Sequence, residues 1–219
     1  MTIETFGLVL AGMNLSFYAS IDRIPLGVAV SLEFVGPLAV AVAGSRRWSD
    51  LVWVGLAVAG ILALTQPGGT RPVDGLGVAF ALLAGCCWGG YILLSARVGR
   101  SFEGGTGLSL AMCFAALVTL PVGVASAGSR LVDIPTLALG CAVGMLSSAI
   151  PYSFELEALR RITPPVFGVL MSLEPAMAAL AGLVVLGQGL SVRTLVGMGL
   201  VISASIGASR RTTEAPTAV

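Results

Sequence analysis

The feature that most constrains this chain is an apolar run at residues 161–177 in which a carboxylate and a proline stand side by side. The run is long enough to cross a bilayer, which takes about 17–25 residues. Glu174 and Pro175 interrupt it, and residues 23–37 repeat its plan, with Pro37 at the place of Pro175. Two interrupted apolar segments in corresponding places predict an internal repeat with a binding site near the middle of the membrane, which is the layout of secondary transporters.

Composition places the chain among integral membrane proteins. Only 11% of its 219 residues are charged, 56% are hydrophobic, and the mean hydropathy is +0.97. A soluble domain carries about a quarter charged residues. A surface with so few charges must face lipid, so the lipid bilayer is an expected partner.

The residue types that are missing exclude several kinds of chemistry. The chain has no His and no Lys, which removes zinc sites built on His, His general bases and Schiff-base lysines. All twelve basic residues are arginines dispersed along the chain, so nothing indicates a nucleic acid partner. Catalytic and phosphate-binding motifs are absent from the sequence. We therefore expect that the protein is not an enzyme and binds no metal and no cofactor. Transport is expected to be driven by an ion gradient or to follow the concentration gradient of the solute.

The hydropathy pattern predicts an all-α polytopic membrane protein. We expect eight membrane helices, the third of them short, connected by polar turns. Their predicted spans are 4–20, 24–44, 51–66, 74–96, 104–126, 134–156, 163–186 and 191–209.

The arginines predict the orientation in the membrane. Eight would lie on one side: Arg46, Arg47, Arg97, Arg100, Arg160, Arg161, Arg210 and Arg211. Four would lie on the other: Arg23, Arg71, Arg130 and Arg193. Because cytoplasmic loops of inner-membrane proteins are enriched in basic residues, the larger group and the C-terminus are expected in the cytoplasm.

The repeat extends beyond the two interrupted segments. Residues 48–55 match 190–197, and residues 14–19 match 152–157, so the first three helices correspond to the last three. Matched helices are five positions apart and must run in opposite directions. This predicts a 5+5 inverted repeat of ten helices whose first copy lacks its first two helices. The expected units are an incomplete first repeat, a second repeat and a cytoplasmic tail: 1–66, 74–209 and 210–219.

Small residues four apart predict close helix packing in two places. They are Gly85 with Gly89 and Gly140 with Gly144. Such spacings let helix backbones approach each other. The signal is weak, because a chain with 29 glycines produces them by chance.

Glu33 and Glu174 are the strongest candidates for a functional role. A carboxylate at bilayer depth costs several kcal/mol unless it faces a polar cavity or a partner. The prolines that follow break the helices and free backbone acceptors, which suit an ammonium group, while half-helix N-termini suit a carboxylate. An amino acid offers both groups. The alternative is that each Glu satisfies only backbone or a neighbouring hydroxyl.

Further polar and aromatic residues complete the candidate site. Asn14, Tyr18, Tyr152 and Glu155 could orient a polar solute or simply link helices, and Glu155 could instead pair with the nearby arginines near the cytoplasmic end. Trp88 and Tyr91 lie in the middle of a predicted helix. They could form an aromatic wall of the cavity or simply pack in the core. The predicted substrate-binding residues are Asn14, Tyr18, Glu33, Pro37, Trp88, Tyr91, Tyr152, Glu155, Glu174 and Pro175.

Several motifs together resemble a known family. They are 14–18 (NLSFY), 23–30 (RIPLGVAV), 33–38 (EFVGPL), 44–47 (GSRR), 88–93 (WGGYIL) and 171–177 (MSLEPAM). The chain resembles the threonine/homoserine exporters of the EamA branch of the drug/metabolite transporter superfamily. It departs from that pattern in lacking two helices, and in having Gly187 and Gln188 where the general pattern has Gly-Glu.

The resemblance implies a fold and a function. Family members have ten helices in two inverted halves and both termini in the cytoplasm. We therefore expect an inner-membrane exporter of small amino acids such as threonine or homoserine, working by alternating access, with proton coupling and a homodimer left open. The alternatives are an exporter of other small metabolites and an inactive membrane fragment, with an intramembrane enzyme third.

Overall fold

The computed structural model describes residues 2–43, 51–65, 74–102, 104–161, 171 and 174–213. These residues form helices, and no strand occurs among them. One short segment, η2, is a 3₁₀ helix, and another, η3, is a π-helical turn. The elements in chain order are α1 (Thr2–Ile21), α2 (Leu26–Glu33), α3 (Val35–Ala43), α4 (Leu51–Thr65), α5 (Gly75–Ser101), α6 (Thr106–Ala127), η2 (Gly128–Val132), α7 (Ile134–Gly144), η3 (Met145–Ala149), α8 (Ile150–Arg161), α10 (Glu174–Val184) and α11 (Val192–Thr213).

Three of the described helical stretches are long and apolar enough to cross a membrane. They are Gly75–Gly99, Thr106–Ala127 and Ile134–Ala158. Shorter apolar helices accompany them at Leu26–Val40, Val52–Leu64, Glu174–Val184 and Val192–Gly207. Large apolar side chains are exposed along these helices, for example Leu117 at 67% and Val184 at 72%. An exposed apolar surface of this extent fits contact with lipid.

The structure refines several predicted spans. The predicted helix at 24–44 is divided, because α2 ends at Glu33 and α3 begins at Val35. The predicted helix at 134–156 is a helical stretch that runs from α7 through η3 into α8. Most of the first half of the predicted helix at 163–186 lies outside the described residues.

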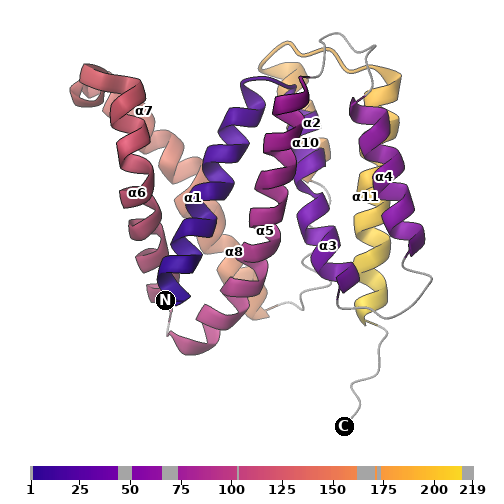
Figure 1. The fold of residues 1–219 in the computed structure, drawn as a ribbon, viewed down its shortest axis with the longest axis horizontal. Helices are drawn as coiled ribbons and strands as arrows, with labels where there is room; N and C mark the ends of the chain where they lie inside the picture. The colour runs from indigo at the N-terminus through magenta and orange to yellow at the C-terminus, as the bar shows by residue number, and fades with distance from the viewer. Residues whose placement is uncertain are drawn as a thin grey trace.

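The helices pack as an antiparallel bundle (Figure 1). α1 packs against α5 and α6, and α2 packs against α5 and α10. α3 contacts α5 and α11, and α4 packs along α11. The start of α1 and the end of α11 lie at the same end of the bundle (Figure 1). The α7–η3–α8 stretch borders this bundle, and neither α7 nor η3 buries a side chain.

Two helix starts show how local chemistry sets the boundaries. The Asp74 carboxylate accepts a hydrogen bond from the Leu76 amide at 3.3 Å and so caps α5. The same carboxylate lies 3.6 Å from the guanidinium of Arg23, which joins the end of α1 to the start of α5. Asp133 caps α7 in the same way by accepting from the amide and the hydroxyl of Thr136.

Glycine permits the closest helix contact in the described bundle, between α3 and α5. A methyl group at position 36 would overlap the carbonyl oxygen of Gly85, and one at position 85 would lie 2.6 Å from the carbonyl oxygen of Glu33. The predicted role of Gly85 and Gly89 is therefore confirmed, since Gly89 also faces Gly36. For Gly140 and Gly144 the described residues show no such contact, since a methyl group added at either position would meet no described atom of another helix within 4 Å.

Candidate functional site

A cavity of about 200 Å³ lies among α1, α2, α5, α8 and α10. By the same measure a single water needs about 10–15 Å³, so the space can hold a small solute. The cavity reaches the molecular surface, where Tyr18 is 42% exposed. Its lining residues are Met13, Asn14, Phe17, Tyr18, Val30, Glu33, Trp88, Ser147, Pro151, Tyr152, Glu155 and Glu174.

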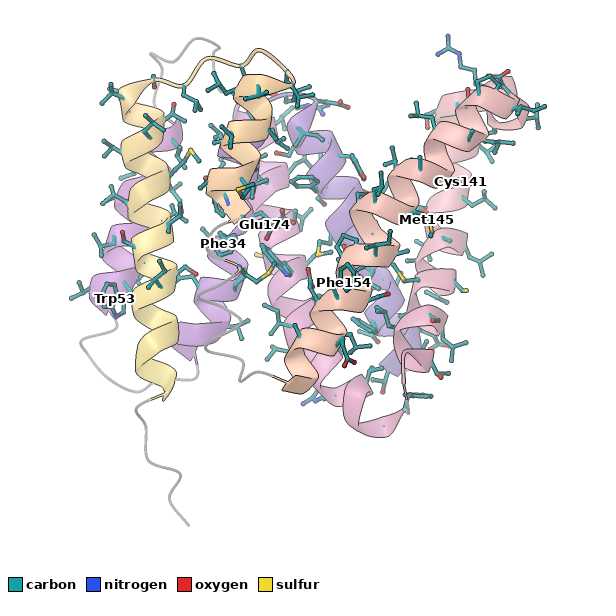
Figure 2. The ribbon with its side chains drawn as sticks, turned by 180° about the vertical axis from the view of Figure 1, so that it is seen from behind. Phe34, Trp53, Cys141, Met145, Phe154 and Glu174 are labelled. Atoms are coloured by element: carbon teal, nitrogen blue, oxygen red, sulfur yellow. The ribbon has the colours of Figure 1, made fainter. Side chains whose placement is uncertain are left out.

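Three carboxylates from three helices meet in this cavity. Glu33 is the last residue of α2, Glu155 lies in α8, and Glu174 lies in the first turn of α10. Glu174 interacts electrostatically with both of the others. Figure 2 shows Glu174 at mid-height in the bundle. None of the described lining residues is basic, so this group of acids needs protons or a cationic solute to balance its charge.

The break between α2 and α3 positions Glu33. Pro37 has no amide hydrogen, so it cannot donate to the carbonyl of Glu33 four residues earlier. Phe34 stands at the break, is fully buried, and packs edge-on against Trp88 with ring centroids 5.1 Å apart. The freed Glu33 carbonyl lies close to Gly85 of α5. This acceptor therefore faces the neighbouring helix, whereas the sequence predicted that it would open to the cavity.

One tyrosine contacts the second carboxylate. The Tyr91 hydroxyl donates to Oε2 of Glu155 at 3.4 Å. Tyr91 is 4% exposed, and its ring packs against the rings of Phe6 and Tyr152, each with its centroid 5.6 Å away. Tyr91 therefore orients Glu155 from behind the cavity wall. The predicted pairing of Glu155 with Arg160 and Arg161 is untested, because those two side chains lie outside the described part of the structure.

Polar groups on α1 face the same space. The Asn14 amide donates to the carbonyl of Leu10 in its own helix at 2.9 Å. The Tyr18 hydroxyl lies 3.3 Å from Oγ of Ser147 in η3. This contact joins α1 to the α7–η3–α8 stretch across the cavity.

The structure brings most of the predicted site together. Seven of the ten predicted residues line the cavity: Asn14, Tyr18, Glu33, Trp88, Tyr152, Glu155 and Glu174. Pro37, Tyr91 and Pro175 do not line it. Pro37 lies just after the break between α2 and α3, and the Tyr91 hydroxyl donates to Glu155. Pro175 is buried in the first turn of α10, where a helix tolerates proline.

Sequence reasoning missed five lining residues. They are Met13, Phe17, Val30, Ser147 and Pro151. Met13 and Phe17 could have been found from helical spacing, because they share a face with Asn14 and Tyr18. For Ser147 the available signal was Pro151, four residues later, which marks a disturbed helix.

The described residues hold no group of His, Cys, Asp or Glu side chains that could bind a metal ion. The three cavity carboxylates are therefore not arranged as a metal site. A carboxylate can bind a proton, and it can accept hydrogen bonds that an ammonium group donates. The three side chains therefore suit either of these partners.

Comparison with known proteins gives consistent results. Residues 75–210 match the EamA-like transporter family. The chain is 46% identical over 205 residues to the threonine/homoserine exporter RhtA of Escherichia coli K12, covering 93% of this chain and 69% of that protein. Identity to the RhtA exporter of Salmonella typhimurium LT2 is 45% over the same length and coverage. An uncharacterized protein of Pseudomonas aeruginosa, PA1977, is 33% identical over 165 residues, covering 71% of this chain and 55% of that protein.

Proposed function

Because the chain belongs to the EamA-like transporter family, we propose that it is a secondary transporter that exports small amino acids of the threonine and homoserine kind. The observation that carries this proposal is the cavity in which Glu33, Glu155 and Glu174 meet without a basic residue among the described lining. An ammonium group supplies the missing positive charge, and the hydroxyl and amide groups on α1 supply polar contacts. Relatives that are 45–46% identical are named as exporters of these two amino acids.

Transport by alternating access fits the positions of Glu33 and Glu174, which both lie at helix ends. Glu33 is held at the break between two short helices, and Glu174 is held in the first turn of α10. Helix ends of this kind can move relative to each other without breaking a long run of backbone hydrogen bonds. A carboxylate that exchanges a proton for the ammonium of the solute would couple export to the proton gradient.

The packing supports an inverted 5+5 repeat, with its halves in residues 1–66 and 74–209. α2 contacts its matched helix α10, and α4 contacts its matched helix α11. The members of each pair run antiparallel (Figure 1). An axis in the membrane plane that passes between the members of each pair would relate the two halves.

The orientation belongs to the same proposal. α1 begins, and α5, α8 and α11 end, at one end of the bundle (Figure 1). Eight of the twelve arginines are near this end in the sequence, at helix starts and ends. We place this end, with the C-terminus, on the cytoplasmic side of the inner membrane.

The test replaces one cavity carboxylate at a time with its amide. Glu33→Gln and Glu174→Gln keep the shape of the side chain but remove its negative charge. We expect export of labelled threonine and homoserine from cells without other exporters of these amino acids to fall about 10- to 100-fold. This is the effect of losing a charged hydrogen-bond partner worth about 1.5–3 kcal/mol.

Glu4→Gln is the matched control, because Glu4 is exposed near the start of α1 and does not line the cavity. It should leave export unchanged, and all three variants should reach the membrane in equal amounts. Full export by both cavity variants would contradict the proposal. Export of a different metabolite by the native chain, with none of threonine or homoserine, would favour the alternative substrate class.

A further inference from the structure

The α7–η3–α8 stretch is disturbed at one point, and the sequence supplies the cause. In η3 the Ile150 amide donates to the carbonyl of Met145, five residues earlier. Pro151 has no amide hydrogen and cannot donate to the carbonyl of Ser147, four residues earlier. The α-helical bonding pattern is therefore interrupted between Met145 and Pro151. Single π-helical turns inside α-helices occur frequently at functional sites.

The disturbed turn presents Ser147 to the cavity that holds the carboxylates. Its hydroxyl lies 3.3 Å from the Tyr18 hydroxyl and 3.5 Å from the hydroxyl of Ser148. Both distances exceed the roughly 2.7–2.8 Å that is typical of a hydroxyl pair. These are weak contacts, and each hydroxyl keeps the capacity to donate or accept another bond.

Three other helical serines behave differently. Ser31 donates to Gly27, Ser126 to Val122 and Ser153 to Ala149, each at 2.5–2.6 Å to a carbonyl four residues earlier. This is the usual way in which a helix satisfies a serine hydroxyl. The contacts of Ser147 run instead to other hydroxyls, across the cavity and along the disturbed turn.

We propose that Ser147, together with Tyr18, recognises the side-chain hydroxyl of the transported amino acid and so determines specificity. This inference rests on the proposed function, in which the carboxylates take the ammonium group. A solute hydroxyl in the cavity donates to one of the two protein hydroxyls and accepts from the other. When the amino acid has no hydroxyl, Ser147 and Tyr18 keep only their long contact of 3.3 Å with each other.

One compound tests the idea for both solutes. 2-Aminobutyrate is threonine without its hydroxyl and also homoserine without its hydroxyl. The purified chain is reconstituted in lipid vesicles loaded with labelled threonine, homoserine or 2-aminobutyrate, and release is measured under one proton gradient. The native chain should release the two hydroxyl amino acids faster than 2-aminobutyrate.

Ser147→Ala should reduce this preference roughly three- to tenfold, which is the range for one hydrogen bond, and leave release of 2-aminobutyrate unchanged. Ser147→Thr, which keeps a hydroxyl, should retain the preference. Tyr18→Phe removes the partner hydroxyl and should reduce the preference by a similar factor. It also provides a second test if Ser147→Ala does not fold. Ser153→Ala is the matched control on α8, because Ser153 does not line the cavity, and it should behave like the native chain.

The outcomes separate this inference from the proposed function. If the native chain releases the three compounds equally, or if Ser147→Ala slows all three by one factor, the assigned role of Ser147 is overturned while export of amino acids stands. An unchanged preference in both Ser147→Ala and Tyr18→Phe overturns it as well. If the native chain releases none of them faster than protein-free vesicles do, the proposed function fails and the inference fails with it.

Discussion

At the residue scale, the three cavity carboxylates differ in how the surrounding structure supports them. Each has a specific support. Glu33 stands at a helix break beside buried Phe34, Glu155 accepts from Tyr91, and Glu174 lies at a helix start, where the helix dipole favours a carboxylate. These supports fix where each side chain stands while leaving its acidic oxygens available to the cavity.

The support of Glu155 can be tested on its own. Tyr91→Phe keeps the ring that packs against Phe6 and Tyr152 but removes the hydroxyl that donates to Glu155. Because the bond is long at 3.4 Å, we expect export to fall only about three- to tenfold, with the unfolding temperature in detergent nearly unchanged.

A second variant shows whether Tyr91 acts through the carboxylate. In a Glu155→Gln background the hydroxyl has lost its charged partner, so adding Tyr91→Phe should cause little further loss. Export rates of the two single variants and the double variant measure this coupling. Fully additive losses would show that Tyr91 contributes independently of Glu155.

At the element scale, the crossing of α3 and α5 fixes the geometry of the α2–α3 break. Gly36 and Gly85 bring the two backbones into contact, and the freed carbonyl of Glu33 lies against Gly85. In lipid, helices associate largely through close packing of this kind between small residues. Burying apolar side chains between helices contributes little there, because the lipid tails are equally apolar. The break is thus held from outside by α5 as well as caused from within by Pro37.

Gly36→Ala should loosen this crossing. The added methyl group would overlap the Gly85 carbonyl, and relieving the overlap requires a shift of backbone. We expect a loss of about 1–3 kcal/mol in stability, seen as a lower unfolding temperature of the detergent-solubilised protein. Gly199→Ala on α11 is the control, because no described neighbouring atom lies within 4 Å of the added methyl. It should be neutral or slightly stabilising, since Ala favours helix over Gly, and equal losses in both variants would contradict the packing argument.

At the scale of the whole molecule, two of the three apolar clusters among the described residues share helix α5. One contains residues of α1, α5 and α6, and the other contains residues of α2, α4, α5, α10 and α11. Trp88 packs against both clusters and also lines the cavity. The cavity therefore lies where the two packed groups meet, a place where a relative movement would open one side and close the other.

The orientation of the molecule has a direct test. A reporter enzyme that is active only in the periplasm, fused after the last residue, should remain silent, because the arginine-rich end is expected in the cytoplasm. The same reporter inserted in the turn between α10 and α11, at the opposite end of the bundle (Figure 1), should be active. The reverse pattern would overturn the proposed orientation.

The sequence by itself determined the class of this protein and much of its candidate site. Low charge and long apolar runs predict helices that cross a membrane, since a helix satisfies its backbone hydrogen bonds within its own segment. The cost of a carboxylate in lipid is likewise a property of the residue, so Glu33 and Glu174 could be selected before any helix was placed beside another.

Only the tertiary structure decided which groups meet. The place of Tyr91 behind Glu155, the contact of the Glu33 carbonyl with Gly85, and the pairing of Tyr18 with Ser147 each join helices that are far apart in the chain. Helical periodicity gives the face on which a side chain stands, but not the neighbour that this face meets. That neighbour depends on how the helices cross, and the crossing is set by contacts such as Gly36 with Gly85, which no single segment contains.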